Sequence, residues 1–565
     1  KLIRTAFKTN NVDHCTRLCH ASSVSAMLEM LGSAAVSNQV SDVKNTEVII
    51  VIGAKPSVNH PVAATFIKNV IKDTQAELIL MDPYRSDLAR HSKYYLQFRP
   101  DTDVLLLNAI MHTIINENLH DRNFIRERTE DFLKLETCVQ EYPPEKVSSI
   151  CGIDAETIRK VARLYARAKR ALIFWGMGVS QHTHGTDNAR CLISLALLCG
   201  HIGKEGSGIH PLRGQNNVQG ASDSGLIPMV YPNYQPVSDD EIRKKFEKLW
   251  GQELNPNIGL TVIEIAEKAF EKELKGLYIM GENPAMSDPN LNFTREALSR
   301  LDFLVVQDIF FTETAGFADV ILPASAFAEK DGTFTNTDRR VQLGRKAVNP
   351  PGEARQDLWI IQDLANRLGL NWQYKTVQDV FNELKETNET IGGISWEMLQ
   401  EQDSVTYPFT QKNKKSEPIL FAESFPTKSG KATFVPANFQ TAEELPDTEY
   451  PFVFITGRHL EHWHTGSMTS RSQVLHDLEP EPTISLNPED IEELNISGFD
   501  KVSISSRRGQ LNASVRVDAN VQRKTIFMAF CFADAAANLI TNEAMDPFGK
   551  IPEFKYCAAK ITPIV

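Results

Sequence analysis

The chain has 565 residues, of which 42% are hydrophobic and 23% charged, a composition that excludes a disordered or fibrous protein. Its 60 Lys and Arg residues against 72 Asp and Glu residues give a net charge of −12, which argues against nucleic acid or an anionic membrane as the main partner. No apolar run approaches the roughly 20 residues of a spanning helix, so direct membrane insertion is not expected. A chain of this length should fold as three or four domains.

The eight cysteines favour a reduced protein. They contain no Cys-x-x-Cys pair and no zinc-type spacing, so we expect a cytoplasmic enzyme rather than a disulfide scaffold. The sequence begins at Lys1 with no signal-peptide pattern, and we expect its natural N-terminus to lie elsewhere.

Strands and helices alternate in the first part of the chain. The β-branched run 48–53, a helix over about 62–72 and a strand at 76–81 predict a βαβ unit, with Asp82 placed where a carboxylate suits nucleotide hydroxyls. Asp154 should cap a helix that runs to about residue 168, before a strand at 171–176. Thr186 and Asp187 should open a further helix.

A second unit of the same kind follows, with strands at 276–281 and 303–308 and a helix between them at about 293–301. The pattern Gly-x-x-Pro-x-x-x-x-Pro follows the lead strand of both units, at residues 53–61 and 281–289. Two interpretations stay open: ordinary strand-to-helix turns, or a duplicated nucleotide-binding lobe. Residues 352–450 are polar and predicted to be helix-rich, whereas the runs after Pro451 predict a mostly β barrel.

Two segments could carry chemistry. In NNVDHCTRLCHASSV (10–24), Cys19 precedes His20 and a helix start, so its thiolate should have a lowered pKa and could be a metal ligand or nucleophile, with His20 as a proton acceptor near neutrality. A Cys-His pair alone is usually incidental. In HPLRGQNNVQGASD (210–223), dense amides should hydrogen-bond a polar partner, and the Arg213 fork suits a carboxylate. A solvated polar loop is the alternative.

Together with GMGVSQHTHGTDN (176–188) and ANLITNEAMDPFGKIPEFKYCA (537–558), these segments resemble the catalytic subunit of molybdenum-dependent formate dehydrogenases, in the molybdopterin oxidoreductase family that includes dimethyl sulfoxide reductase. The resemblance covers essentially the whole chain. It implies an α/β fold with two Rossmann-like nucleotide-binding lobes and a C-terminal six-stranded, double-psi-like β-barrel. The implied domains are 15–213 with the metal-ligand cysteine and one guanine dinucleotide site, 214–445 with 1–14, and 450–565.

The resemblance also implies the site. Cys19 would ligate molybdenum within a bis(molybdopterin guanine dinucleotide) cofactor, His20 would stand beside it, and Arg213 would hold formate. The implied cofactor-binding residues are Gly53, Asn59, Asp82, Asp103, Met177, Gly178, Gln181, Gln215, Gly281, Asn283, Gln307, Asp308, Asp338, Gly457, Arg458, His462, His464, Asn538 and Lys555. Relatives carry a Cys-rich 4Fe–4S site at their N-terminus, and we expect that segment to be missing here.

The implied activity is oxidation of formate to carbon dioxide, with electrons passed to iron–sulfur clusters and on to partner subunits or an electron acceptor. One alternative is nitrate-reductase-type oxygen-atom transfer on the same scaffold, and another is a non-catalytic scaffold that has lost molybdenum. His20 beside Cys19, together with Arg213, argues against both.

Further polar residues keep two interpretations each. His182 and His184 could line a substrate funnel or belong to a polar loop near the cofactor. His459, His462 and His464 could form a second metal site or hydrogen-bond the cofactor. The pairs Arg339-Arg340 and Arg507-Arg508 could bind pyrophosphate or lie on the surface.

Overall fold

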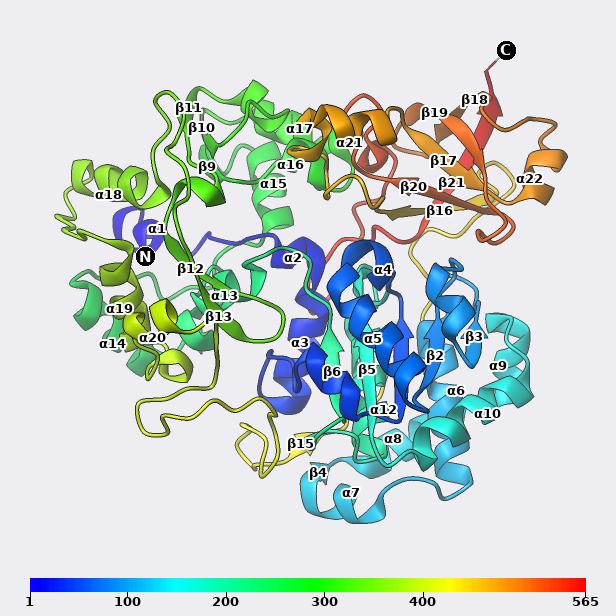
Figure 1. The fold of residues 1–565 in the computed structure, drawn as a ribbon. Helices are drawn as coiled ribbons and strands as arrows, with labels where there is room; N and C mark the ends of the chain where they lie inside the picture. The colour runs from blue at the N-terminus through cyan, green and yellow to red at the C-terminus, as the bar shows by residue number, and fades with distance from the viewer. Residues whose placement is uncertain (565) are drawn as a thin grey trace. The chain divides into compact units, whose positions relative to one another are not determined.

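The computed structural model describes residues 1–564, and contacts between residues divide the chain into two units (Figure 1). Unit 1 consists of residues 1–17, 215–288 and 292–418, and unit 2 of residues 18–214, 289–291 and the segment from 419 onward. Each unit is described by itself. The division into three domains at 213/214 and near 445–450 stays a prediction.

Unit 2 contains a five-stranded parallel sheet in the order β3-β2-β1-β5-β6 and a closed six-stranded barrel in the order β16-β20-β17-β19-β18-β21. Its helices are α2 (Thr16–Cys19, which begins in unit 1), α3 (Ala21–Leu31), α4 (Pro56–Asn59), α5 (Pro61–Asp73), α6 (Asp103–Asn116), α7 (Arg122–Arg128), α8 (Phe132–Val139), α9 (Pro144–Cys151), α10 (Ala155–Arg167), α11 (Met177–Ser180), α12 (Gly185–Leu198), α21 (Gln473–Leu478) and α22 (Pro488–Glu493). Its strands are β1 (Val48–Ile52), β2 (Glu77–Met81), β3 (Tyr94–Leu96), β4 (Thr129–Glu130), β5 (Ala171–Trp175), β6 (Gly208–Pro211), β15 (Ala432–Thr433), β16 (Phe452–Gly457), β17 (Thr483–Leu486), β18 (Lys501–Ser505), β19 (Gln510–Val517), β20 (Thr525–Ala529) and β21 (Cys557–Pro563).

The sheet of unit 2 is covered on both faces, which is why its central strands are continuously apolar. All five residues of β1 are buried, as are all five of β5. Ala63, Ile67 and Val70 of α5 join the core that one face of the sheet forms. In Figure 1 this sheet and its helices run from blue to teal, and the barrel runs from orange to red. The predicted parallel lobe and the predicted six-stranded barrel are confirmed.

Unit 1 holds a smaller parallel sheet in the order β11-β10-β9 and an antiparallel sheet in the order β12-β13-β14. Its helices are α1 (Leu2–Ala6), α13 (Val218–Asp223), α14 (Asp240–Trp250), α15 (Val262–Phe270), α16 (Pro284–Ser287), α17 (Leu291–Ser299), α18 (Asp357–Arg367), α19 (Val377–Thr387) and α20 (Trp396–Glu401). Its strands are β7 (Val230–Tyr231), β8 (Gln235–Pro236), β9 (Gly276–Met280), β10 (Phe303–Asp308), β11 (Val320–Pro323), β12 (Gly332–Thr335), β13 (Arg340–Gly344) and β14 (Val405–Thr406).

The two Gly-x-x-Pro turns have the same backbone plan as well as the same spacing. β1 is followed by Gly53 with φ +54°, a four-residue helix begins at Pro56, and a longer helix follows. β9 is followed by Gly281 with φ +62°, a four-residue helix begins at Pro284, and α17 follows. Glycine tolerates this left-handed conformation, and proline suits the first turn of a helix. The shared plan extends the resemblance between the two lobes from sequence to conformation.

Close backbone approach at Gly178 leads to a stability prediction. A Cβ added to Gly178 would lie 2.8 Å from both the Cα and the carbonyl oxygen of Gly53. Gly178→Ala should therefore lower the free energy of unfolding by about 1–3 kcal/mol, as overpacking does, measured by urea denaturation. Gly316→Ala is the control, because an added Cβ there meets nothing within 4 Å. Equal effects of the two substitutions would contradict the steric argument.

The helix-rich prediction for 352–450 is wrong beyond residue 401. Helices α18, α19 and α20 occupy its first half, but only the two-residue strands β14 and β15 follow before residue 450. Five prolines fall in this second half, at positions 408, 418, 426, 436 and 446. Each removes a backbone donor and disfavours helix in the residue before it. The polar composition was therefore a weaker signal than the proline spacing.

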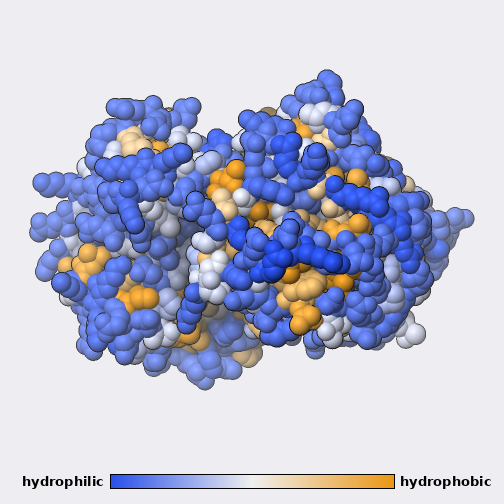
Figure 2. Space-filling model, turned by 90° about the horizontal axis from the view of Figure 1, so that it is seen from below, coloured by the Kyte–Doolittle hydropathy of each residue, from blue (hydrophilic) through white to orange (hydrophobic). Residues whose placement is uncertain are grey.

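The surface and the cysteines add two observations. No helix within residues 1–564 is both long and apolar enough to cross a membrane. On the face shown in Figure 2, hydrophilic residues dominate and hydrophobic ones form separate groups between them. All eight cysteines are free thiols, six of them buried.

Candidate active site

A cavity in unit 2 brings many of the predicted cofactor residues together. It encloses about 1200 Å³, its opening included, and residues of the parallel lobe and of the barrel segment line it. In α/β sheets, ligands bind beyond the carboxyl ends of parallel strands, which is where the loops after β1, β2 and β5 contribute to this wall. The predicted residues in the wall are Gly53, Asn59, Asp82, Asp103, Met177, Gly178, Gly457, Arg458 and Lys555.

Cys19 lies at the end of α2, two residues before the start of α3, and is 3% exposed. The backbone N–H of Gly214 donates to its sulfur, and the charges of Arg213, Arg458 and Lys555 act on it. Burial raises the pKa of the Cys19 thiol more than these cations lower it. The prediction of a lowered pKa for Cys19 is therefore wrong for the chain without cofactor, because desolvation outweighs the effect of the nearby positive charges.

His20 is fully buried, and both of its ring nitrogens have partners. Nε2 lies 2.8 Å from the carbonyl oxygen of Leu212 and Nδ1 lies 3.1 Å from Oγ of Ser180. Burial, followed by the charge of Arg213, lowers the pKa of His20 to about 3. The expected titration near neutrality is therefore wrong for the chain alone. The geometry describes a neutral imidazole that donates to Leu212 and accepts from Ser180.

In the sequence, Arg213 lies between Leu212, which contacts His20, and Gly214, which contacts Cys19. Its guanidinium is 3% exposed, and Nη2 donates to the carbonyl oxygen of Ala34 at 3.1 Å. Its own carbonyl oxygen accepts from Nε2 of His60 at 2.7 Å. The neighbours Leu212 and Gly214 both line the cavity. The short segment 212–214 therefore contacts Cys19, contacts His20 and carries the buried arginine.

Two cations that form no salt bridge with a carboxylate of residues 1–564 line the cavity on the barrel side. Nε of Arg458 donates to Oδ1 of Asn59 at 3.0 Å, while Nη1 has no hydrogen-bond partner within residues 1–564. Lys555 donates to the carbonyl oxygen of Thr456 at 2.5 Å. Burial lowers the pKa of Lys555 to about 7 and that of Arg458 to about 10. Buried cations in this state favour an anionic occupant.

Carboxylates line the wall of the parallel lobe. Burial raises the pKa of Asp82 to about 7 and that of Asp103 to about 6. Oδ1 of Asp103 has no hydrogen-bond partner in the described part of the chain. Carboxylates accept hydrogen bonds from N–H groups, such as those on the edge of a guanine or pterin ring. The cavity thus offers hydrogen-bond acceptors from the parallel lobe and positive charges from the barrel segment.

Comparison with known proteins decides the family. The model of "Molybdopterin oxidoreductase" matches residues 1–367, and that of "Molydopterin dinucleotide binding domain" matches residues 452–558. The chain belongs to the molybdopterin oxidoreductase family. It is 47% identical over 566 residues to the F420-dependent formate dehydrogenase subunit alpha of Methanocaldococcus jannaschii, covering 100% of this chain and 83% of that protein. It is 37% identical to formate dehydrogenase H of Escherichia coli, covering 100% of this chain and 79% of that protein. The structure of acetylene hydratase from Pelobacter acetylenicus matches 97% of this chain and 82% of its own, with a TM-score of 0.80 at 21% identity.

The predicted family and fold class are thereby confirmed, and the family implies a molybdopterin cofactor. The cavity of this molybdopterin oxidoreductase fits such a group. Nη1 of Arg458, in the cavity wall, is a buried polar atom that lacks a protein partner within residues 1–564, and an anionic phosphate or pterin group would supply an acceptor. Nε2 of His464 is in the same state; it lies outside the lining but close to the lining residue Gly214. The glycines at 53, 176 and 178 let the turns after β1 and β5 approach each other closely in this wall, because an added Cβ at each would lie within 2.8 Å of the neighbouring backbone.

The buried amine at the barrel side leads to a pH prediction. An unfolded lysine has a pKa near 10.4, whereas Lys555 has a pKa of about 7 in the folded chain. Between these values the unfolded state binds a proton that the folded state lacks, so this group makes stability rise with pH. Lys555→Met should remove that contribution from the cofactor-free chain, measured by urea denaturation from pH 7 to 10. The exposed Lys72→Met is the control and should keep the wild-type slope.

Four of the predicted cofactor residues of unit 1 lie at the ends of two neighbouring parallel strands. Gly281 and Asn283 follow β9, and Gln307 and Asp308 end β10, so these four gather at the carboxyl edge of one sheet. The side chain of Asn283 bonds Glu313 and Thr314. Their roles stay predictions, as do those of the remaining unit 1 residues, namely the half-buried Gln215 and the buried Asp338.

Three predicted cofactor residues of unit 2 are buried but do not line the cavity: Gln181, His462 and Asn538. The half-buried His464 and the buried Cys19, His20 and Arg213 also lie outside its lining. Gln181 donates through Nε2 to the carbonyl oxygen of Leu18 at 2.6 Å, next to Cys19. Both ring nitrogens of His462 lie near local partners, Thr469 and the carbonyl of Glu479. Their assignment to the cofactor is not tested by these contacts and stays a prediction.

The structure decides some of the interpretations left open for the histidines at 459–464 and for the two arginine pairs. His459 has Glu461 and Glu479 as its potential co-ligands, not the two other histidines. Arg339 is fully buried and donates to the carbonyls of Tyr407, Glu417 and Pro418, which contradicts a surface position. Arg508 pairs with Glu444 at 2.6 Å.

The sequence interpretation missed several residues of the cavity wall, including His60 and Asp101. His60 directly follows the predicted Asn59, and Asp101 lies two residues before the predicted Asp103. Their closeness in the sequence to predicted cofactor residues was therefore the signal that could have identified them.

Proposed function

We propose that this chain is the catalytic, alpha-type subunit of a molybdenum-dependent formate dehydrogenase that oxidises formate to carbon dioxide. The observation that carries the proposal is the junction of Cys19, His20 and Arg213 at segment 212–214. Relatives at 37–47% identity over the whole chain bear the name formate dehydrogenase, which supports the same substrate here. The reaction balances as HCOO⁻ → CO₂ + H⁺ + 2e⁻.

We propose bis(molybdopterin guanine dinucleotide) with molybdenum as the cofactor. Arg458 and Lys555 would hold its anionic groups, Asp82 and Asp103 would accept from its ring N–H groups, and Cys19 would ligate the metal. When bound, this cofactor supplies a centre that accepts the two electrons from formate.

Arg213 binds and orients the substrate in this proposal. Its planar fork matches a carboxylate, and a contact made in a buried site is stronger than one made in water. His20 takes up a proton only when its burial is offset, because the chain alone holds its pKa at about 3. Bound anions would cancel the opposing charge of Arg213 and raise that pKa.

For the electron path we propose transfer to iron–sulfur clusters, including a 4Fe–4S cluster in the complete enzyme, and on to a partner subunit or another electron acceptor. The words "subunit alpha" in the names of relatives support a multi-subunit enzyme. We propose a cytoplasmic location, which the free thiols support. Iron and acid-labile sulfide in the complete enzyme would test the cluster.

The deciding experiment is an assay of the purified enzyme with formate and with nitrate, alongside molybdenum and pterin analysis. The proposal expects formate-dependent dye reduction and no nitrate-dependent dye oxidation. Nitrate turnover alone would establish the oxygen-transfer alternative. A protein that holds neither molybdenum nor pterin and turns over neither substrate would be the non-catalytic scaffold.

A further inference from the structure

A buried carboxylate contacts a buried imidazole at the edge of the cavity. Glu553 is fully buried, and within residues 1–564 the only hydrogen bond of its carboxylate is with Nδ1 of His182, at 3.0 Å. Nε2 of the same ring lies 3.0 Å from the carbonyl oxygen of Gly178. An ionised carboxylate and a backbone carbonyl both accept hydrogen bonds, so with Glu553 in its ionised form both ring nitrogens present a proton. The geometry therefore describes His182 as an imidazolium.

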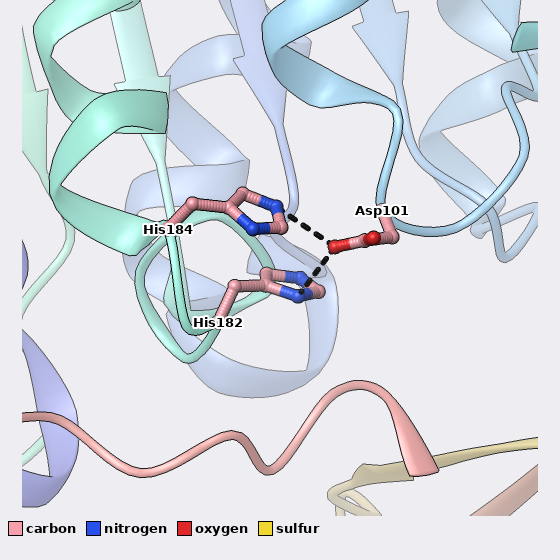
Figure 3. A group of neighbouring side chains, drawn as sticks. All are labelled: Asp101, His182 and His184. Atoms are coloured by element: carbon pink, nitrogen blue, oxygen red, sulfur yellow. Dashed lines mark ion pairs between the residues drawn. The ribbon is translucent and has the colours of Figure 1, made fainter. Parts of the chain in front are cut away.

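Asp101 adds a second negative charge to this group. One of its oxygens lies 2.8 Å from Nε2 of His184 and 3.5 Å from Nδ1 of His182, and the other accepts from the backbone N–H of Ala442 at 2.7 Å. Figure 3 shows the two imidazoles converging on one carboxylate oxygen. The two rings stack with centroids 5.5 Å apart. The charged and titratable groups that face His182 are thus Asp101, His184 and Glu553, with Asp103 further away.

The backbone of Asp101 supports a dedicated role for its carboxylate. Its φ is +71°, a conformation that a residue with a side chain rarely adopts and that costs about 1–2 kcal/mol. The residue lies directly before Thr102 and helix α6, in the cavity wall. Surrounding contacts must hold it there, and its ion pairs with the two histidines are among them.

The pair His182–Glu553 joins two segments that line the cavity. Through its Nε2, His182 contacts Gly178, whose N–H donates to the carbonyl oxygen of Gly53 at 3.0 Å. Glu553 lies two residues before Lys555 in the segment that leads into β21. One ion pair therefore connects the turn at 176–182 with the segment that carries the buried amine.

We propose that His182 is a positioning residue, held as an imidazolium by Glu553 and Asp101, and that this charged clamp fixes the segments 176–182 and 553–555 around the pterin cofactor. The inference rests on the proposed function only in taking the cavity as the cofactor site. His184 holds the same oxygen of Asp101 through its Nε2. No contact with formate is assigned to these residues.

The first experiment observes the charge directly in the protein without reference to turnover. In ring-¹³C-histidine protein, the His182 signal is assigned by its loss in His182→Gln. The pKa of His182 should be near 9, because Glu553, Asp101 and Asp103 raise it against the effect of burial. Glu553→Gln should move the titration to below pH 7. A neutral His182 ring at pH 7 in the wild-type protein would overturn the proposal.

The second experiment measures retention of the pterin cofactor after incubation between pH 7 and 10. Because the pKa of His182 is raised in the folded protein, the imidazolium clamp is intact at low pH and is lost as the pH rises through about 9. Wild-type protein should lose cofactor at least about tenfold faster at pH 10 than at pH 7, and Glu553→Gln should lose it fast at both. A pH profile unchanged by Glu553→Gln would overturn the proposal.

Matched variants separate the clamp from general destabilisation. His201→Gln removes another buried histidine of unit 2, which contacts the carbonyl of Tyr165, and should leave cofactor retention unchanged. If Glu553→Gln fails to fold, the double variant His182→Gln, Glu553→Gln removes both charges together and should fold while losing cofactor quickly. Equal loss of cofactor in His201→Gln would count against a specific clamp.

A metal ion could replace the proton, because Asp101, His182 and His184 place three ligating atoms within 4.8 Å of one another. Metal analysis tests this directly. The proposal expects no stoichiometric divalent metal apart from the cofactor and any iron–sulfur iron. One zinc ion per chain that disappears in Asp101→Asn would overturn the imidazolium assignment. Formate turnover can fail for other reasons and decides none of these outcomes.

Discussion

Arg213→Ala is expected to lower kcat/KM for formate by about a hundredfold to a thousandfold, with kcat and KM both affected. Truncating one partner of a buried charged hydrogen-bonded pair typically costs about 2–5 kcal/mol. The guanidinium is buried beside the segment that contacts Cys19 and His20, so it can act on the substrate both in the ground state and at the transition state. Steady-state kinetics with a dye acceptor measures the effect.

Arg213→Lys is the matched variant, because it keeps the charge and removes the fork. A lysine cannot make the bidentate contact, so an intermediate loss is expected. Arg126→Ala, at an exposed arginine, should leave the kinetics unchanged. Near-normal turnover in Arg213→Ala would remove this residue from formate binding.

Cys19→Ala is expected to lower formate oxidation by at least about a thousandfold, the scale on which removal of one member of a catalytic unit acts. The thiol is the proposed metal ligand, and the methyl group of alanine offers no donor atom. The fold should remain intact, since the substitution removes only one atom, and Gly214, which contacts that sulfur, already lines a cavity. Activity and the thermal unfolding midpoint, measured on the same preparation, separate the two effects.

Cys191→Ala provides the control, since this buried cysteine of α12 has Oδ1 of Asn108 as its hydrogen-bond partner. It should cost some stability and leave the rate per molybdenum unchanged. If Cys19→Ala kept more than about a tenth of wild-type activity, ligation by residue 19 would be excluded.

Much of the fold could be predicted from local patterns. The strands at 48–53 and 171–176 were apolar runs bounded by glycine, and Asp154 caps α10 as expected, accepting from the N–H of Thr157. Such signals act over a few residues, which is why they can be read in one dimension. The segment 402–450 was mispredicted because composition alone does not show where backbone donors are missing.

The candidate site could be predicted less completely. Cys19, His20 and Arg213 were identified from motifs, but their protonation could not be, because burial of His20 and Cys19 depends on residues far away in the chain. The contact between Glu553 and His182 joins positions 371 residues apart, and no local pattern announces it. The sequence around Asp101 likewise does not indicate its left-handed backbone conformation or its ion pairs with His182 and His184.

The wall of the cavity draws on two stretches that are far apart in the sequence, 53–214 and 455–555. While a ribosome is still translating codons before 555, the nascent chain lacks the amine and the Glu553 carboxylate. The pterin cofactor can therefore meet the complete cavity wall only after Lys555 has been synthesised.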